Sequence, residues 1–140
     1  MSDVKALAAL LAILFAQEAD FTPDTRRQSR ALRLILKQPG TGRILCATDQ
    51  DGVIGMVSLL FTVSTAQGGR AAWMEDLVVQ PDKRGRGIGE RLLKEAISAA
   101  RTAGCSRITV LTDAHNDRAK RLYRRAGFVP SAMSPLRLYL

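Results

Sequence analysis

The sequence predicts a single α/β domain in which a mixed, mostly antiparallel sheet is flanked by helices. Three observations support this prediction. The length of 140 residues suits one ordinary domain. Apolar residues recur with helical spacing over residues 4–37, whereas residues 43–80 form β-rich runs separated by glycine-containing turns. A glycine-rich loop then opens a second helical region without any linker, so residues 1–140 are predicted to fold together.

The first two segments are predicted to be helices. Residues 4–18 carry apolar side chains such as Leu7 and Leu14 on one helical face. The apolar run over residues 6–16 is shorter than the about 20 residues that cross a bilayer, which favours a buried helix in a cytoplasmic protein over a membrane span or a signal peptide. A second helix is predicted over residues 24–37. Its apolar side is expected to hold Leu32, Leu34, Ile35 and Leu36.

The period then changes to that of strands. Residues 43–48, 53–64 and 71–80 are rich in β-formers, and the turns at 49–52 and 65–70 are short. Short connections predict an antiparallel order for these strands.

The last third alternates helix and strand. A helix is predicted over residues 87–103, a strand over 107–112 and a helix over 116–126. The connection from the third strand through the first of these helices is long enough for a parallel crossover. The stretches at 128–130 and 135–140 are predicted to be short final strands, because apolar and polar residues alternate in the second of them.

The charge of the chain favours an anionic partner. The net charge is +8, and ten of the 21 basic residues lie in two clusters. These are Lys83, Arg84, Arg86, Arg91 and Lys94, and then Arg118, Lys120, Arg121, Arg124 and Arg125. Two focused clusters suit a compact polyanion better than a long duplex, and an aromatic fraction of 5% argues against nucleic acid. The second cluster can equally be a solvated helix face.

No metal site is predicted. Cys46 and Cys105 lie far apart without metal-ligand spacing, and the only histidine, His115, is in a polar turn. Both cysteines are expected to be small buried residues rather than nucleophiles.

The stretch "RGRGIG" (residues 84–89) is the strongest candidate binding site. It matches neither the phosphate loop G-x-x-x-x-G-K-[ST] nor the dinucleotide fingerprint G-x-G-x-x-G. It does place glycines at the start of a predicted helix. Glycine lets the backbone approach a ligand closely, and the N–H groups of a first helical turn attract anions. A glycine turn that only caps the helix is the alternative.

Two ordered motifs resemble those of the Gcn5-related N-acetyltransferases. The stretch "LVVQPDKRGRGIGERLL" (77–93) is similar to the acetyl-CoA motif of that family, and "NDRAKRLYRRAGF" (116–128) is similar to its second motif. The resemblance covers roughly residues 4–130. The chain departs from the family in one respect, since the strand that usually precedes the first helix is missing. Either the strand is dispensed with, or the start is truncated or supplied by a partner, and an exposed sheet edge there would favour a homodimer.

The resemblance implies acetyl-CoA as co-substrate, without a metal. It implies that Leu77, Val78 and Val79 offer backbone groups to the pantetheine arm, and that Asn116 contacts this arm or braces the site. Tyr123 matches the tyrosine that protonates the departing thiolate. The residues implied to hold the pyrophosphate are Arg84, Gly85, Arg86, Gly87, Ile88 and Gly89.

The two acidic residues of the third strand are candidates for the general base. Glu75 and Asp76 lie in an otherwise apolar stretch, and strand alternation predicts that they point to opposite faces. Glu75 is the preferred base, and Asp76 the second candidate. Alternatively, either carboxylate is simply exposed to solvent or paired with an arginine.

The sequence therefore predicts an N-acetyltransferase that moves an acetyl group directly to a primary amine of a small molecule or peptide. Residues 18–30 and 129–136 are expected to form the acceptor walls. A non-catalytic acyl-CoA-binding sensor or scaffold of the same fold is the alternative. A nucleic-acid binder is a weaker one, and no membrane partner is expected.

Overall fold

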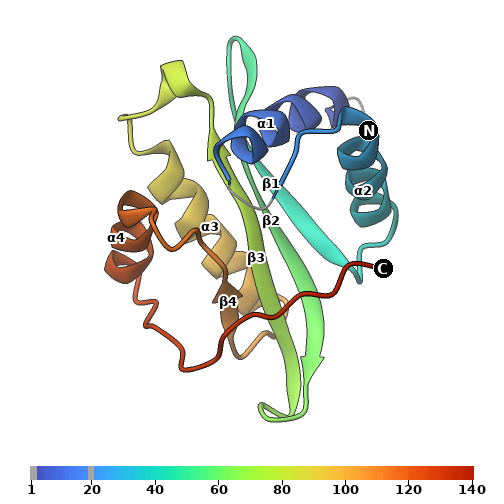
Figure 1. The fold of residues 1–140 in the computed structure, drawn as a ribbon, viewed down its shortest axis with the longest axis vertical. Helices are drawn as coiled ribbons and strands as arrows, with labels where there is room; N and C mark the ends of the chain where they lie inside the picture. Colours follow the sequence, from blue (N-terminus) through green and yellow to red (C-terminus); the bar gives the residue numbers. More distant parts are fainter. Residues whose placement is uncertain (1–2, 19–20) are drawn as a thin grey trace.

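The computed structural model describes residues 3–18 and 21–140. Residues 19–20, which belong to the predicted acceptor wall at 18–30, lie outside the described part. Two helices come first, followed by three strands and then by helices around a short fourth strand (Figure 1). The elements are α1 (Val4–Gln17), α2 (Thr25–Lys37), β1 (Gly42–Asp49), β2 (Gly52–Ser64), β3 (Gly69–Val79), the 3-10 turn η1 (Pro81–Lys83), α3 (Ile88–Thr102), β4 (Ile108–Val110) and α4 (Asp117–Arg125).

The sheet has the order β1-β2-β3-β4. β1 pairs with β2, and β2 with β3, in antiparallel fashion, because tight turns join them. β4 runs parallel to β3 and pairs Ala72 with Ile108 and Met74 with Val110. The predicted mixed, mostly antiparallel sheet with flanking helices is confirmed, as is the start with two helices and no preceding strand in the described residues.

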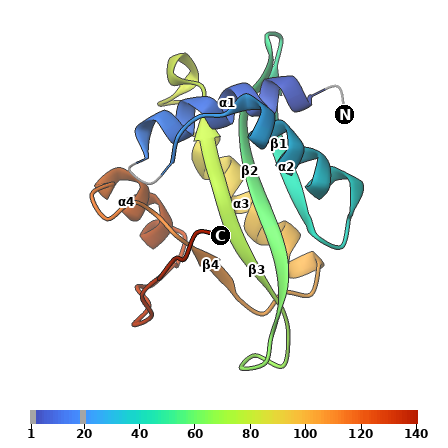
Figure 2. The same ribbon diagram turned by 45° about the vertical axis from the view of Figure 1, so that its right-hand side comes forward.

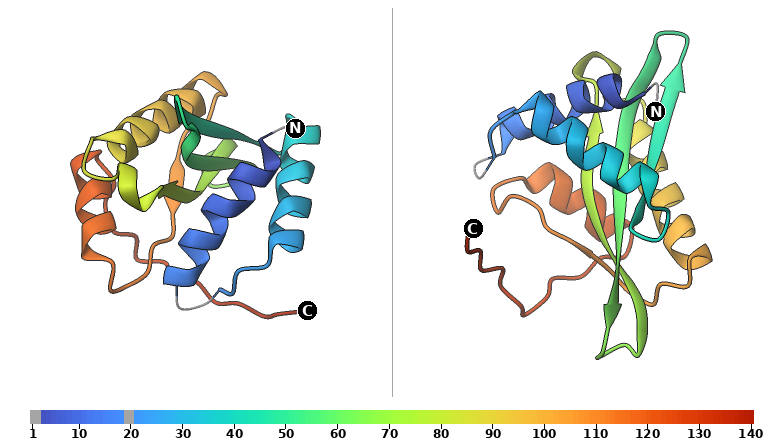
Figure 3. Two further views of the ribbon diagram at one scale, coloured as in Figure 1. Left: turned by 90° about the horizontal axis from the view of Figure 1, so that it is seen from above. Right: turned by 90° about the vertical axis from the view of Figure 1, so that its right-hand side faces the viewer.

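Helices cover both faces of the sheet (Figures 2 and 3). On one face, Leu7 and Leu10 of α1 pack with Met56 and Val78 of the sheet. On the other face, Leu93 of α3 packs with other sheet residues, and Leu122 and Tyr123 of α4 pack against the same apolar cluster. The two apolar layers fix the positions of α1 and α3, and β3 runs between them.

A bulge interrupts β3. Met56 of β2 pairs with Val78, but Ser58 pairs with Glu75, so β3 carries one extra residue between two paired positions. Asp76 has a φ of 58°, a value that non-glycine residues rarely adopt. The parallel pairing with β4 ends at Met74. As a result, the half-strand Glu75–Val79 continues beyond the end of β4.

The segment after Phe128 contradicts the prediction of final strands. It contains no strand, and it crosses the face of the sheet that carries α1 and α2 (Figures 1 and 3). Leu136 and Leu138 are almost fully exposed. Apolar and polar residues alternate in 135–140, a pattern that suits pairing with another strand. Pro130 and Pro135 interrupt the segment, however, and the described chain offers it no partner strand.

Two smaller predictions were also wrong, and one remains a prediction. Leu34 and Leu36 of α2 are exposed, and only Leu32 of that helix is fully buried. Cys46 is exposed because it lies on β1, the edge strand, whereas Cys105 is half-buried. No helix in the described ranges is long and apolar enough to cross a membrane. Cytoplasmic location stays a prediction.

Candidate active site

The glycine loop opens α3 without a side-chain cap. Gly85 and Gly87 have φ values of 79° and 77°, and a Cβ at either position would meet open space. In the described chain, no side chain accepts a hydrogen bond from the first turn of α3. By contrast, Asp24 caps α2 by accepting from the backbone N–H groups of Arg26 and Arg27. The start of α3 therefore keeps its N–H groups available for an anion.

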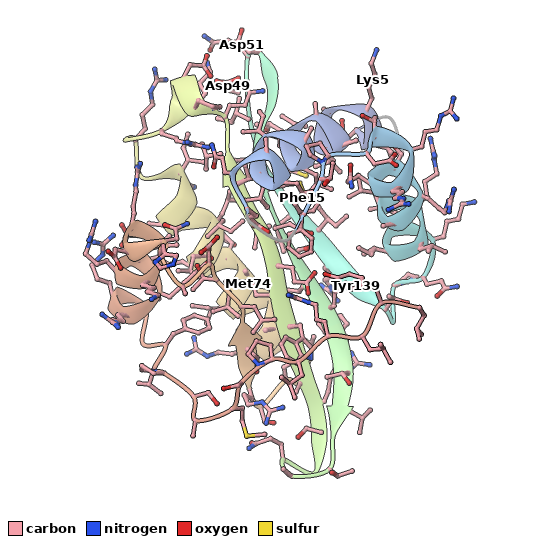
Figure 4. The ribbon with its side chains drawn as sticks, viewed as in Figure 1. Lys5, Phe15, Asp49, Asp51, Met74 and Tyr139 are labelled. Carbon is pink, nitrogen blue, oxygen red and sulfur yellow. The ribbon has the colours of Figure 1, made fainter. Side chains whose placement is uncertain are left out.

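Lys83 of the predicted basic cluster is neutralised by two carboxylates, and Lys94 of the same cluster pairs with Glu90 within α3. Lys83 Nζ lies 2.9 Å from Asp49 Oδ2 and 2.8 Å from Asp51 Oδ2. Figure 4 shows both carboxylates at the tip of the β1–β2 hairpin, beside η1. These ion pairs join the hairpin to the residue before the loop. They also leave Arg84 and Arg86 as the cations of the loop itself.

The half-strand Glu75–Val79 has an open edge beside the loop. Gln80 N donates to Ile54 O on β2 at 2.8 Å. Backbone groups alternate between the two edges of a strand, so those of Val79 point away from β2 and those of Val78 point toward it. Arg84 Nε donates to Val79 O at 3.0 Å. Of the three residues predicted to offer backbone groups, Leu77 and Val79 thus face the open edge, whereas Val78 is used by the sheet.

The second feature is a pocket between α1, α2 and β3, which we call the carboxylate pocket. Its volume is about 340 Å³, within the range of small-molecule sites. Three carboxylates line it, together with apolar and basic side chains. The carboxylates belong to Glu18, Glu75 and Asp76, and the other lining residues include Phe15, Phe21, Arg27, Leu111 and Arg137.

The predicted opposite orientation of Glu75 and Asp76 was wrong. Both line the carboxylate pocket, because the bulge breaks the alternation of the strand at Asp76. Buried Ser58 supports this arrangement. Its hydroxyl lies within donating distance of two acceptors, with Oγ 3.0 Å from Glu75 O and 3.2 Å from Asp76 Oδ2.

The pocket shifts the proton affinity of two carboxylates. Burial raises the pKa of Asp76 to about 6, the charge of Glu75 adds to this rise, and the Ser58 hydrogen bond opposes it. Burial also raises the pKa of Glu18 to about 7, and the charge of Asp76 is the next cause. Both carboxyls can therefore accept a proton near neutral pH, which is what a general base requires.

Tyr123 lies on α4, and Asn116 directly precedes this helix. The ring of Tyr123 packs against the apolar layer under α3 and lies 5.7 Å from the ring of Phe128, centroid to centroid. Burial, and then the charge of Glu18, raises the pKa of Tyr123 to about 12, so the phenol stays protonated. Asn116 Oδ1 accepts from Ala119 N at 3.1 Å and caps α4.

The sequence placed Glu18 at the start of the predicted wall at 18–30 without giving it a role of its own, and it singled out neither Ser58 nor Arg137. Glu18 ends α1 and reaches the pocket only because α1 crosses β3. A serine in an apolar strand was a signal that could have drawn attention to position 58. Arg137 lies one residue beyond the predicted wall at 129–136, and its guanidinium stacks on the Phe21 ring at 5.5 Å. Although three carboxylates line the pocket, the described residues contain no cluster able to hold a metal ion.

Comparisons with known proteins point to one family. A family model described as "Acetyltransferase (GNAT) family" matches residues 7–128. The chain is 34% identical over 93 residues to the thialysine N-epsilon-acetyltransferase of Bos taurus, a match that covers 66% of this chain but only 51% of that protein. It is 32% identical over 124 residues to the uncharacterized N-acetyltransferase YhfO of Bacillus subtilis, covering 86% of this chain and 83% of the relative.

Solved structures share the whole fold. An integron cassette protein from a salt-marsh metagenome superposes with a TM-score of 0.85 at 28% identity, over 99% of this chain and 86% of that one. A predicted acetyltransferase of Clostridium acetobutylicum, crystallised with acetyl-CoA, superposes with a TM-score of 0.78 at 17% identity, over 99% and 90% of the two chains.

Proposed function

The chain belongs to the acetyltransferase (GNAT) family, and on this basis we propose that it transfers the acetyl group of acetyl-CoA directly to a primary amine of a small molecule or peptide. One observation carries the proposal. The half-strand Glu75–Val79 joins an open helix N-terminus with cations at one end to a pocket of titratable carboxylates at the other.

Acetyl-CoA fits the loop end of this half-strand. Its pyrophosphate needs backbone N–H donors and positive charge, and the uncapped first turn of α3 with Arg84 and Arg86 offers both. The structural neighbour from Clostridium acetobutylicum, which was crystallised with acetyl-CoA, supports this choice of donor. The open edge at Leu77 and the N–H of Val79 suit the amide groups of the pantetheine arm, whereas Val79 O already accepts from Arg84 Nε. We assign Val78 only to the sheet, and Asn116 to bracing α4.

The reaction needs an oxyanion site and a proton donor. The amine nitrogen attacks the thioester carbonyl, and the C–S bond then breaks to release the thiolate of CoA. A backbone N–H on the open edge would stabilise the developing oxyanion. The protonated phenol of Tyr123 would donate its proton to the thiolate. We propose direct transfer because neither Cys46 nor Cys105 lines the carboxylate pocket in the described residues.

The carboxylate pocket would receive the amine. A primary amine is protonated at neutral pH and must lose a proton before it attacks. We propose Asp76 as the base, with Glu75 and Glu18 holding the ammonium ion in place. The sequence analysis preferred Glu75 over Asp76 as the base. We reverse this order because Asp76 is more buried than Glu75 and burial raises its pKa.

Thermal unfolding with added acetyl-CoA tests the donor. At about 100 times its dissociation constant, a ligand specific for the folded state stabilises it by roughly 2.7 kcal/mol. We expect acetyl-CoA, but neither ATP nor NAD, to raise the unfolding temperature. Amines would then be screened by release of free CoA thiol. Binding of acetyl-CoA without thiol release for any amine would favour a sensor or scaffold instead.

We also propose a homodimer. β1 lies at the edge of the sheet, and its outer side has no partner strand in the described chain. Exposed edges tend to pair with another strand. Light scattering on purified protein measures the mass in solution, and a monomer at all concentrations would contradict this proposal.

A further inference from the structure

α2 carries a row of cations that the proposed chemistry does not use. The side chains of Arg26, Arg30, Arg33 and Lys37 recur at intervals of four, three and four residues, which places them on one side of the helix. We call these four residues the α2 stripe. All four are exposed, and α2 contains no acidic residue. Nitrogen-tipped side chains project from the outer side of α2, away from the sheet (Figure 4).

The positive charges of the α2 stripe are not neutralised by acidic side chains of the described residues. Among the described residues, none of its four cations forms an ion pair, whereas the neighbouring Arg27 pairs with Asp24 at 3.4 Å. A furrow of about 540 Å³ lies between the stripe side chains. The like charges repel one another when alone, so an anionic partner would relieve them.

The chemistry of the α2 stripe selects among anionic partners. Single-stranded nucleic acid needs aromatic stacking platforms, and the furrow has none in its lining. A membrane-surface helix needs a broad apolar face beside its cations, and the furrow includes only one large apolar residue, Leu34. An acidic peptide needs only spaced cations, and it is the partner that fits.

The spacing of the cations is slightly shorter than that of an extended peptide, and the long side chains of arginine and lysine can span the difference. Successive stripe residues rise by about 4.5–6 Å along the helix. Alternate side chains of an extended peptide are about 6.6 Å apart and lie on one side. Carboxylates at every second position of a peptide can therefore each meet a successive cation of the stripe.

The position of α2 relates this surface to the carboxylate pocket. Arg27, Gln28 and Leu32 of α2 line the pocket, while the stripe occupies the adjoining side of the same helix. A chain lying on the stripe can thus turn into the pocket. We propose that the α2 stripe binds an acidic, extended peptide segment of the acceptor while the acceptor amine enters the carboxylate pocket. The role as acceptor rests on the proposed function.

Two peptides test this surface directly. Each has a blocked N-terminus and one central lysine, flanked on both sides by serine alternating with glutamate in one peptide and with glutamine in the other. Binding is measured by fluorescence anisotropy without acetyl-CoA, so the result does not depend on catalysis. We expect the glutamate peptide to bind roughly tenfold more tightly at low salt, with the difference shrinking as salt is added.

Charge-neutralising variants locate the binding surface. Arg30→Gln/Arg33→Gln should weaken binding of the glutamate peptide roughly threefold to tenfold, the loss of two exposed ion pairs. The control Arg101→Gln/Arg107→Gln removes the same charge from exposed positions on α3 and before β4, and should change binding less than about twofold. Equal binding of the two peptides, or equal losses in the two variants, would overturn the proposal. The proposal would also be overturned if Arg30→Gln/Arg33→Gln weakened binding of a DNA oligonucleotide or of phosphatidylserine vesicles but not of the glutamate peptide.

A small diamine separates this proposal from the proposed function. Thiol release with propane-1,3-diamine reports acetyl transfer without a peptide, and we expect Arg30→Gln/Arg33→Gln to leave it unchanged. If the unmodified protein released no thiol, this result would count only against the proposed transferase activity. Peptide discrimination by the stripe would still stand as a property of the surface.

Discussion

The carboxylate pocket and the glycine loop lie at opposite ends of the half-strand Glu75–Val79, and they carry their charge in different ways. The pocket uses side chains, and burial raises the pKa of two of its carboxyls toward neutrality. The loop relies largely on backbone N–H groups, made accessible by glycines with positive φ. The acceptor end should therefore respond to pH, whereas the donor end should respond to backbone conformation.

The largest effect is expected at Tyr123, which packs under α3 and senses the charge of Glu18. Tyr123→Phe keeps the packing and removes the proton donor. We expect kcat to fall about 100-fold, within the range for loss of a general acid. The rate of thiol release at saturating substrate measures kcat. Calorimetry measures the affinity for acetyl-CoA, and this affinity should stay the same. An unchanged kcat would leave Tyr123 with a packing role only.

A proline in the first turn of α3 tests whether the loop acts through its backbone. Gly89→Pro removes one N–H donor from the first turn of α3, where this N–H makes no intrahelical hydrogen bond in the described chain. We expect the dissociation constant of acetyl-CoA to rise roughly 10–100-fold, the loss of one hydrogen bond to a charged group. The fold should persist in circular dichroism.

Gly89→Ala is the matched control. A Cβ at this position would lie 3.9 Å from Val79 Cγ2, an ordinary contact, and the N–H donor remains. If alanine and proline weakened binding equally, bulk rather than the donor would be responsible, and the contrast between the two ends would fail.

Asp76→Asn tests the titratable end through stability. The folded pKa of about 6 lies above the ordinary 3.8, so the proton on Asp76 stabilises the folded state. This stabilisation is complete below about pH 3.8 and is lost as the pH rises through about 6. The variant, which tolerates positive φ and can still accept from Ser58, should therefore be more stable at pH 8 by about 2 kcal/mol. Denaturant unfolding at pH 4 and pH 8 measures the difference, and equal stability at pH 8 would contradict the raised pKa.

The same variant should change the pH profile. In the unmodified protein we expect kcat/KM to rise between about pH 6 and pH 7, as Asp76 and Glu18 lose their protons. Any residual activity of Asp76→Asn should show this rise at lower pH, because the charge of Asp76 contributes to the raised pKa of Glu18. Gly89→Pro should leave the profile in place.

The smallest effect is expected at Lys83. Lys83→Gln removes the cation that joins Asp49 and Asp51 to the start of the loop, and it leaves two carboxylates near the pyrophosphate. We expect KM for acetyl-CoA to rise about threefold with kcat unchanged, as for loss of ion pairs near the surface. The double variant Lys83→Gln/Asp51→Asn should recover part of the loss, and a lowered kcat would contradict this positioning role.

Much of the fold could be predicted because its signals are local. Helical periodicity, short turns and Gly104 and Gly127 after helices marked the element boundaries closely. The failures involve contacts that no local pattern describes. Alternation placed Glu75 and Asp76 on opposite faces because it assumes a regular strand. Alternation in residues 135–140 indicated a strand but could not supply its partner. Glu18 joined the pocket through the crossing of α1 over β3.

The extra residue in β3 has a consequence for insertions and deletions. Residues Ala72 and Met74 face α3, and beyond the bulge Leu77 and Val79 pack on that same side, while Val78 packs on the other. With position 76 removed, these residues would still alternate correctly, and the ladder with β2 would run without a shift. The sheet therefore has no need of Asp76. A protein from which Asp76 is deleted should fold with a straighter β3, but it would lose the Asp76 carboxylate and the bulge in the strand. At this position the fold and the candidate chemistry can be separated by deletion.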